Sequence, residues 1–163
     1  MQIVLTNKNT LIFDEFKFKC VIGKKGITSK KKEGDLKTPK GLFSLGPLYF
    51  RKDRINNLET NLKKIPIKKN MVWCDDSSSN FYKKLTKKNK KFSYEKMFRK
   101  DNLYDLVVVI NYNTKKVIKN KGSAIFLHLT NNFNKTRGCI ALKKNDLLIL
   151  LKLINKKTKI KIV

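Results

Sequence analysis

His128 and Cys139 are the residues of this chain whose types and spacing best fit a chemical reaction. His128 is the only histidine, and Cys139 is one of three cysteines. A cysteine reacts as its thiolate, and a neighbouring imidazole is a common base for forming that thiolate. Gly138 precedes the cysteine, and its flexible backbone allows the nearby amides to face a developing oxyanion. These residue types together indicate acyl transfer by a cysteine.

The two residues lie in apolar, strand-like runs that the chain can bring together. One run covers 124–129 and the other covers 139–142, with turn-forming asparagines between them. A hairpin or a pair of neighbouring strands would bring the imidazole close to the thiol. The alternative is that Cys139 is a small buried hydrophobic residue and His128 a hydrogen-bonded structural one. Spacing by itself does not decide between these interpretations.

The segment Gly122 to Leu142 resembles the active-site block of YkuD-type L,D-transpeptidases. That block consists of a histidine, a gap, and then Ser/Thr-His-Gly-Cys. The matching positions here are His128, Thr136, Arg137, Gly138 and Cys139. The likeness covers most of the chain from Lys31 to Val163 and is most specific in this segment.

Two positions depart from the family's usual block. Arg137 takes the place of the second histidine, and Ala141 stands where many members have an arginine. The gap after the first histidine is also shorter than usual. Some bacterial members resemble this variant, with GSAIFLH followed by T-x-G-C. The resemblance therefore implies that these are features of a subgroup.

The segment Lys31 to Phe43 is rich in turn formers, which predicts a surface loop leading into a strand around 43–45. It is also similar to the family's second block, K-x-GDG-x-TP-x-G-x-F. The matching residues are Gly34, Asp35, Thr38, Pro39, Gly41 and Phe43. Leu36 replaces the second glycine of that block. The resemblance implies that this segment shapes the pocket wall and takes no part in the chemistry.

The net charge of +27 raises the question of a nucleic-acid partner. The basic residues comprise 35 lysines and only 4 arginines, whereas surfaces that read bases favour arginine. The charge is spread from Lys8 to Lys161 without forming one basic stripe. We therefore expect no specific nucleic-acid partner. The lysines are assigned mainly to solvated faces, with a secondary role in binding an anionic polymer or membrane surface.

Length and composition indicate one globular domain over residues 1–163, of which 40% are hydrophobic. No apolar run is long enough for a transmembrane segment, and no signal peptide is visible in this chain. The odd number of cysteines excludes a complete disulfide set. A bridge between Cys20 and Cys74 is conceivable but not required. With one histidine and no CxxC pair, we expect no metal site.

Apolar runs predict a series of strands. They are expected at 2–6, within 11–22, around 43–45 and 71–74, and at 104–113, 124–129, 139–142 and 158–163. The β-branched run 106–110 fits a central strand covered on both faces. The alternating segment 158–163 fits a final edge strand. The basic segment 47–70 is expected to be irregular because Pro47 and Pro66 act as breakers.

The residues around Trp73 allow two interpretations. In the first, Trp73 is buried in a short strand that runs into a turn containing Asp75 and Asp76. In the second, one of these carboxylates lies at a pocket edge and binds an amine of a substrate. We favour the structural interpretation, because neighbouring strand residues point to opposite faces and so do not form an acid–base pair.

Two helical segments are expected, a turn at 94–99 and a longer helix near the C-terminus. Asn145 or Asp146 is the expected cap of the longer helix, which ends near Ile154. The predicted fold class is mainly β, a β-rich α+β arrangement. It takes the form of a single-domain β-sandwich or partly closed barrel of the L,D-transpeptidase type with one C-terminal helix.

The resemblance implies an L,D-transpeptidase that acts on peptidoglycan stem peptides through an acyl-enzyme. Cys139 would be the nucleophile and His128 the base, and the backbone amides of Gly138 and Cys139 would form the oxyanion hole. Arg137 and Thr136 would bind substrate. No cofactor is expected. The implied partners are donor and acceptor stem peptides, and the implied protein is a monomer in the periplasm or cell envelope.

Three alternatives remain open at this point. The same Cys139–His128 pair would give an L,D-carboxypeptidase if water resolved the acyl-enzyme. A basic, non-enzymatic module would bind cell-wall polymer or nucleic acid, with Cys139 only structural. A redox protein would use the Cys139 thiol without forming an acyl-enzyme.

Overall fold

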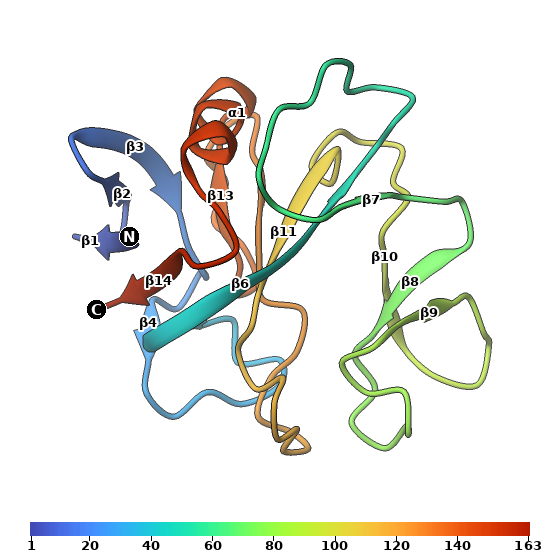
Figure 1. Ribbon diagram of the computed structural model, residues 1–163. Helices are drawn as coiled ribbons and strands as arrows, with labels where there is room; N and C mark the ends of the chain where they lie inside the picture. The colour runs from blue at the N-terminus through green and yellow to red at the C-terminus, as the bar shows by residue number, and fades with distance from the viewer.

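Eight strands close into a barrel in the computed structural model, which describes residues 1–163 (Figure 1). Around the barrel they are β11 (Leu106–Ile110), β12 (Phe126–Leu129), β13 (Ile140–Leu142), β3 (Phe16–Val21), β2 (Thr10–Phe13), β1 (Gln2–Thr6), β14 (Lys159–Ile162) and β6 (Gly41–Phe50). The barrel closes because β11 pairs antiparallel with β6. The predicted mainly β class is confirmed, and the barrel, not the sandwich, is the arrangement that forms.

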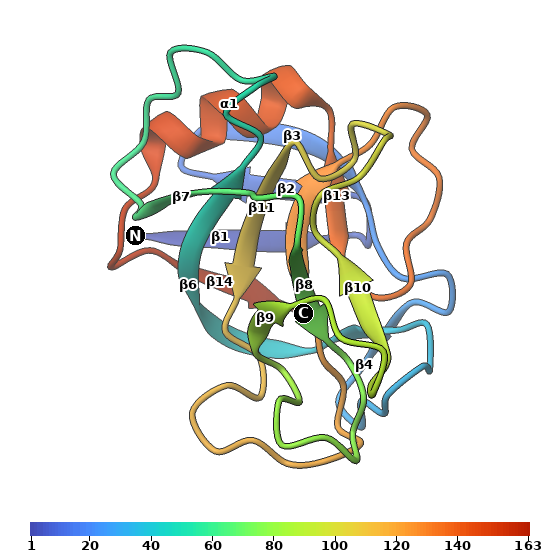
Figure 2. The same cartoon turned by 90° about the vertical axis from the view of Figure 1, so that its right-hand side faces the viewer.

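Short elements surround the barrel. They are β7 (Lys64–Pro66) beside β6, the pair β4 (Ile27–Thr28) and β5 (Thr38–Pro39), the three-stranded sheet of β8 (Met71–Cys74), β9 (Leu85–Lys87) and β10 (Tyr94–Lys96), and the helix α1 (Lys144–Leu153). Figure 2 shows the three-stranded sheet in front of the barrel. Its position explains why β11 is buried along its whole length.

The side chains of β11 alternate between two apolar clusters. Leu106, Val108 and Ile110 point into the large core of the barrel. Val107 and Val109 belong to a second core that includes residues of the three-stranded sheet. Because both faces of β11 are covered, an unbroken apolar run is favourable here. The prediction of a doubly covered central strand is therefore confirmed.

Helix α1 packs on the barrel (Figure 1 and Figure 2). Its Leu147, Leu150 and Leu151 are fully buried and belong to the large apolar core. The helix begins at Lys144 with Lys143 as its N-cap, so the predicted caps Asn145 and Asp146 were wrong by two and three residues. Asp146 instead lies in the first turn, where the helix dipole favours a carboxylate. The helix has 10 residues, and no helix of the structure is long and apolar enough to span a membrane.

Two predictions about local structure were wrong. The segment expected as a helical turn contains β10, which pairs antiparallel with β8 and sets Tyr94 opposite Cys74. The segment expected to be irregular begins within β6, which continues through Pro47 to Phe50. The pairing of β6 with β11 shifts register between Leu45 and Leu48. Pro47 is accommodated because it lies at this register shift, where its missing backbone N–H interrupts no regular ladder hydrogen bond.

The last strand, β14, is an interior strand and not the predicted edge. It pairs parallel with β1 and antiparallel with β6. Its polar and apolar residues alternate because one face of the strand packs in the barrel and the other faces solvent. Such alternation does not indicate whether a strand has one neighbouring strand or two. The cysteines outside the active-site block, Cys20 and Cys74, are both free and lie in different apolar clusters.

Candidate active site

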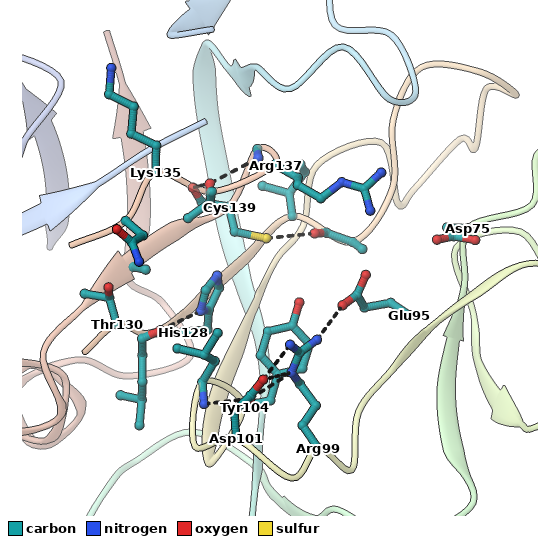
Figure 3. Close-up of a pocket in the computed structure, with 18 of the residues that line it drawn as sticks. Asp75, Glu95, Arg99, Asp101, Tyr104, His128, Thr130, Lys135, Arg137 and Cys139 are labelled. Atoms are coloured by element: carbon teal, nitrogen blue, oxygen red, sulfur yellow. Dashed lines mark hydrogen bonds and ion pairs between the residues drawn. The ribbon is translucent and has the colours of Figure 1, made fainter. Parts of the chain in front are cut away.

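The parallel pairing of β12 with β13 brings His128 and Cys139 into one cavity. His128 lies opposite Ala141 in this register, and Cys139 immediately precedes β13. The two strands are thus parallel neighbours and not a hairpin. The cavity has a volume of about 420 Å³, and the imidazole and thiol both line it (Figure 3). Of the two arrangements that the sequence allowed, the pair of neighbouring strands is the one that forms.

The Cys139 thiol is buried, with 8% of the residue exposed. Burial raises its pKa to about 12, although the nearby Phe126 amide acts in the opposite direction. The thiol donates a hydrogen bond to the carbonyl oxygen of Ala124, with 3.1 Å between Sγ and O. It is therefore protonated at neutral pH, and proton transfer must accompany its use as a nucleophile.

The Ala124 carbonyl reaches the thiol from an unusual backbone conformation. Ala124 has a φ of 49°, in the left-handed region that residues with a Cβ rarely occupy. Such conformations cost free energy and persist where the surrounding structure holds them. Here the neighbouring strand β12 and the contact with Cys139 fix the position. The strained residue therefore lies directly at the Cys139 thiol.

His128 is held as a neutral base. Its Nδ1 lies 2.8 Å from the carbonyl oxygen of Leu129, which can only accept, so Nδ1 carries the proton. Nε2 then has the free lone pair. Burial lowers the imidazole pKa to about 4, and the Leu129 carbonyl partly opposes this shift. Tyr104 packs edge-on against the ring, with 5.2 Å between ring centroids.

Thr136 organises the loop that carries Cys139. Its hydroxyl donates to the Cys139 carbonyl oxygen at 2.6 Å and accepts from the Gly138 amide at 3.1 Å. The hydroxyl and the Gly138 N–H are thus engaged within the loop. The Cys139 N–H, by contrast, has no hydrogen-bond partner in the protein. It is the free amide donor at the thiol.

Gly138 is required by its backbone and by its surroundings. Its φ is 145°, and an added Cβ would lie 2.9 Å from the carbonyl oxygen of Lys37. The Gly138 carbonyl accepts from the Thr38 hydroxyl at 2.9 Å, and that hydroxyl accepts from the Gly23 amide at 2.9 Å. Thr38 therefore joins the cysteine loop to the segment Lys31 to Phe43, which was expected to shape the pocket wall.

Leu36 shows how the second block accommodates a residue in place of glycine. Its φ is 60°, again in the left-handed region. Its carbonyl oxygen accepts from the Lys25 amide at 3.0 Å, which ties the block to the loop after β3. The strain of a side chain at this position is thus tolerated because the backbone is fixed on both sides.

A charged network that was not predicted from the sequence lines one side of the cavity. Arg99 donates three hydrogen bonds to the Asp101 carboxylate, at 2.7, 2.9 and 3.2 Å, and one to Glu95 at 3.2 Å. Its guanidinium also lies 5.0 Å from the ring centroid of Tyr104, the residue that packs on His128. The available signal was that Arg99 is one of four arginines in a lysine-rich chain.

The cavity has charged residues on two sides (Figure 3). Arg137 is exposed beside Cys139 and forms no ion pair, so its guanidinium is free to bind an anion. Asp75 lines the cavity from the other side and accepts from the Ser93 hydroxyl at 2.6 Å. Asp76 instead forms a turn with Ser78. The pocket-edge interpretation thus fits Asp75, and the turn interpretation fits Asp76.

No group of three or more His, Cys, Asp or Glu side chains is placed to hold a metal ion. A family model described as the L,D-transpeptidase catalytic domain, YkuD, matches residues 2–162. No curated protein matches the chain.

The low pKa of His128 should appear in the pH dependence of stability. Because the folded-state pKa of about 4 lies below the ordinary 6.5, protonation favours unfolding. The stability that the neutral imidazole contributes is fully present above the unfolded-state pKa and is lost as the pH falls towards 4. In urea unfolding, lowering the pH from about 7 to about 4.5 should reduce the free energy of unfolding of the wild type by about 2–3 kcal/mol more than that of His128→Asn. An equal loss of unfolding free energy in the two proteins would contradict the conclusion that His128 is buried as a neutral imidazole.

Gly138→Ala should disorder the cysteine loop. The strained φ and the close Lys37 carbonyl should cost about 1–3 kcal/mol in unfolding free energy. The displaced thiol should react with an acylating agent roughly 100-fold more slowly. Gly26→Ala is the matched control, since Gly26 has a φ of 82° but nothing within 4 Å of an added Cβ. An acylation rate equally low in both variants would show that the Lys37 contact is not responsible.

Proposed function

The chain belongs to the YkuD family of L,D-transpeptidase catalytic domains, and we propose that it transfers peptidoglycan stem peptides through a thioester on Cys139. The family acts on peptidoglycan peptides. The observation that carries the proposal is the shared cavity of the Cys139 thiol and an imidazole whose Nε2 is unprotonated. This pair provides a nucleophile and its base in one site.

In the first half-reaction, the Cys139 sulfur attacks the carbonyl carbon of an L,D-peptide bond in the donor. His128 Nε2 accepts the thiol proton as the carbon–sulfur bond forms. The tetrahedral intermediate then collapses, the carbon–nitrogen bond breaks, and the imidazolium returns the proton to the departing amine. The products are a thioester and a released D-residue.

The second half-reaction reverses this sequence with a different amine. The acceptor amine attacks the thioester carbonyl, and His128 removes its proton. When the carbon–sulfur bond breaks, the proton returns to the Cys139 sulfur. The product is a new peptide bond that cross-links two stem peptides. Water in place of the amine would give the L,D-carboxypeptidase reaction with the same residues.

The Cys139 N–H is proposed as the main oxyanion donor. It has no partner within the protein, whereas the Gly138 N–H donates to Thr136. The Gly138 amide joins the oxyanion hole only if substrate draws it away from the Thr136 hydroxyl. Thr136 thereby supports substrate binding by holding the loop. A preformed donor at the developing charge is the kind of contact that lowers an acyl-transfer barrier.

Burial sets the resting state of the catalytic pair. The pKa of Cys139 is raised to about 12 and that of His128 is lowered to about 4, so both groups are neutral before substrate binds. A neutral pair avoids the cost of burying two charges. Oxidation and acyl transfer both require the thiolate, so the raised pKa does not distinguish them. The match to the transpeptidase family favours acyl transfer over the redox alternative.

Arg137 is proposed to bind a carboxylate of the stem peptide. Its guanidinium is exposed at the rim of the cavity and has no ion-pair partner. A planar guanidinium can hold a carboxylate with two hydrogen bonds. The family's function suggests a location in the cell envelope, and we propose the periplasmic or extracytoplasmic side, with the chain acting as a monomer.

Incubation with a carbapenem provides the first test, because its strained carbonyl acylates an activated thiol. Ring opening loses no atoms, so the intact mass should rise by the whole mass of the inhibitor. Cys139→Ala should form no adduct, and His128→Ala should form it at least roughly 100-fold more slowly because it lacks the base.

Cys20→Ala is the matched control for this experiment. Cys20 is also a free, buried cysteine, but it lies outside the cavity. This variant should form the adduct at the wild-type rate. An adduct that persists in Cys139→Ala, or a wild type that forms none, would refute the proposed nucleophile.

The role of Arg137 is tested with a stem peptide whose carboxylate is free. Arg137→Ala should raise KM about tenfold, because an exposed bidentate pair contributes about 1 kcal/mol or slightly more. Arg137→Lys should recover only part of this loss, since lysine keeps the charge but not the planar fork. Amidation of the substrate carboxylate should remove the difference between the variants. An unchanged KM in Arg137→Ala would exclude the contact.

A further inference from the structure

A second, basic cavity adjoins the active-site cavity. It has a volume of about 830 Å³ and lies between the segments 29–33 and 112–121. Lys31 and Glu33 line both cavities, so the two spaces meet at these residues. Lys31 is fixed there, because its Nζ lies 2.6 Å from Asp35 and its side chain packs on Gly122. The two cavities therefore adjoin at the wall that Lys31 and Glu33 form.

The walls of this second cavity, which we call the lysine groove, carry uncompensated positive charge. The exposed lysines that line it and form no ion pair are Lys30, Lys32, Lys116, Lys119 and Lys121. Glu33 is the only carboxylate in the wall, and it accepts a hydrogen bond from the Tyr82 hydroxyl at 2.6 Å. The groove therefore favours an anionic ligand.

The loop that presents three of these lysines is held by its own side chains. Asn113 donates to the carbonyl oxygens of Ile118 at 2.9 Å and Gly122 at 3.3 Å, and accepts from the Ile118 amide at 2.8 Å. The Tyr112 hydroxyl donates to the Lys121 carbonyl oxygen at 2.6 Å. The positive charges are thus carried by a loop that is tied down at several points.

Ser123 lies in the chain between Lys121 of the lysine groove and Ala124, which contacts Cys139. It lines the active-site cavity next to Ala124, whose carbonyl accepts from the Cys139 thiol. The residue is only 6% exposed, and its hydroxyl has no hydrogen-bond partner. Buried hydroxyls are almost always paired, so the unpaired Ser123 hydroxyl keeps its hydrogen-bonding capacity for a group that approaches through the active-site cavity.

We propose that the lysine groove and Ser123 form an extended subsite for a carboxylate-bearing peptidoglycan strand. The Ser123 hydroxyl bonds to the backbone of the peptide whose carbonyl reaches Cys139. The lysines bind carboxylates on neighbouring stem peptides of the same strand. The subsite would favour polymeric substrate over short free peptides. This inference rests on the proposed function, because it takes peptidoglycan as the ligand.

Binding is tested by co-sedimentation with insoluble peptidoglycan in the Cys139→Ala background, which prevents turnover. The triple change Lys116→Glu, Lys119→Glu and Lys121→Glu should weaken binding about tenfold, since each exposed charge contributes a fraction of a kcal/mol. The control triple Lys8→Glu, Lys17→Glu and Lys157→Glu makes the same change in net charge away from both cavities. It should have a much smaller effect.

Two further conditions separate the groove from general charge attraction. High salt should abolish the difference between the two triple variants, because it screens exposed charges. Chemical amidation of the peptidoglycan carboxylates should abolish it as well. Equal weakening by both triples, or a difference that persists on amidated peptidoglycan, would overturn the proposal.

Ser123 is tested by turnover of a stem peptide. Ser123→Ala should raise KM about fivefold through the loss of one hydrogen bond, with little change in kcat. Ser123→Thr retains the hydroxyl and should restore KM. An unchanged KM, or a raised KM that threonine does not restore, would assign Ser123 to packing and overturn its role.

Carbapenem adducts, measured in the lysine variants that retain Cys139, distinguish failure of the lysine-groove proposal from failure of the proposed catalytic function. If an adduct forms on Cys139 but the groove triple binds peptidoglycan as well as the control triple, only the groove proposal fails. If the wild type forms no adduct while the groove lysines still govern binding, the proposed catalytic function fails. The chain would then be a basic binding module for cell-wall polymer.

Discussion

The parallel pairing of β12 with β13 is the constraint on which the active site depends. It sets His128 opposite Ala141, so the imidazole and the residue before β13 open into the same cavity. Both strands are buried along their whole length, and a one-residue shift of β12 would exchange its two faces and turn His128 into the apolar core of the barrel. The relative positions of His128 and Cys139 are therefore tied to the register of the barrel strands.

Burial is the second determinant of the site's chemistry. It holds the thiol and the imidazole neutral, and the fixed carbonyls of Ala124 and Leu129 then decide where their protons lie. The strained backbone of Ala124 and the hydrogen bonds of Thr38 keep the cysteine loop in place. Exposed charge without an ion-pair partner lies at Arg137 on the rim and along the lysine groove, where an anionic polymer can reach it from solvent.

Much of the fold was predictable from local pattern. The continuous apolar run of β11, the turn-rich second block and the C-terminal helix each correspond to a clear sequence signal. The wrong secondary-structure predictions have a common cause: pairing with a neighbouring strand overrides the local conformational preference of the residues. Pro47 lies inside β6 because a register shift accommodates it, and Tyr94 is in a strand because β8 lies beside it.

The identities of Cys139 and His128, the turn-forming residues around them and the family of the chain can all be read from the sequence. A thiol, one imidazole and a glycine are visible in the chain, because their chemistry is a property of the residues. Only the tertiary structure decided which nitrogen of His128 is free, which amide remains unpaired at Cys139, and that a lysine groove meets the cavity. These features arise from contacts between segments far apart in the chain, and local pattern carries no record of those contacts.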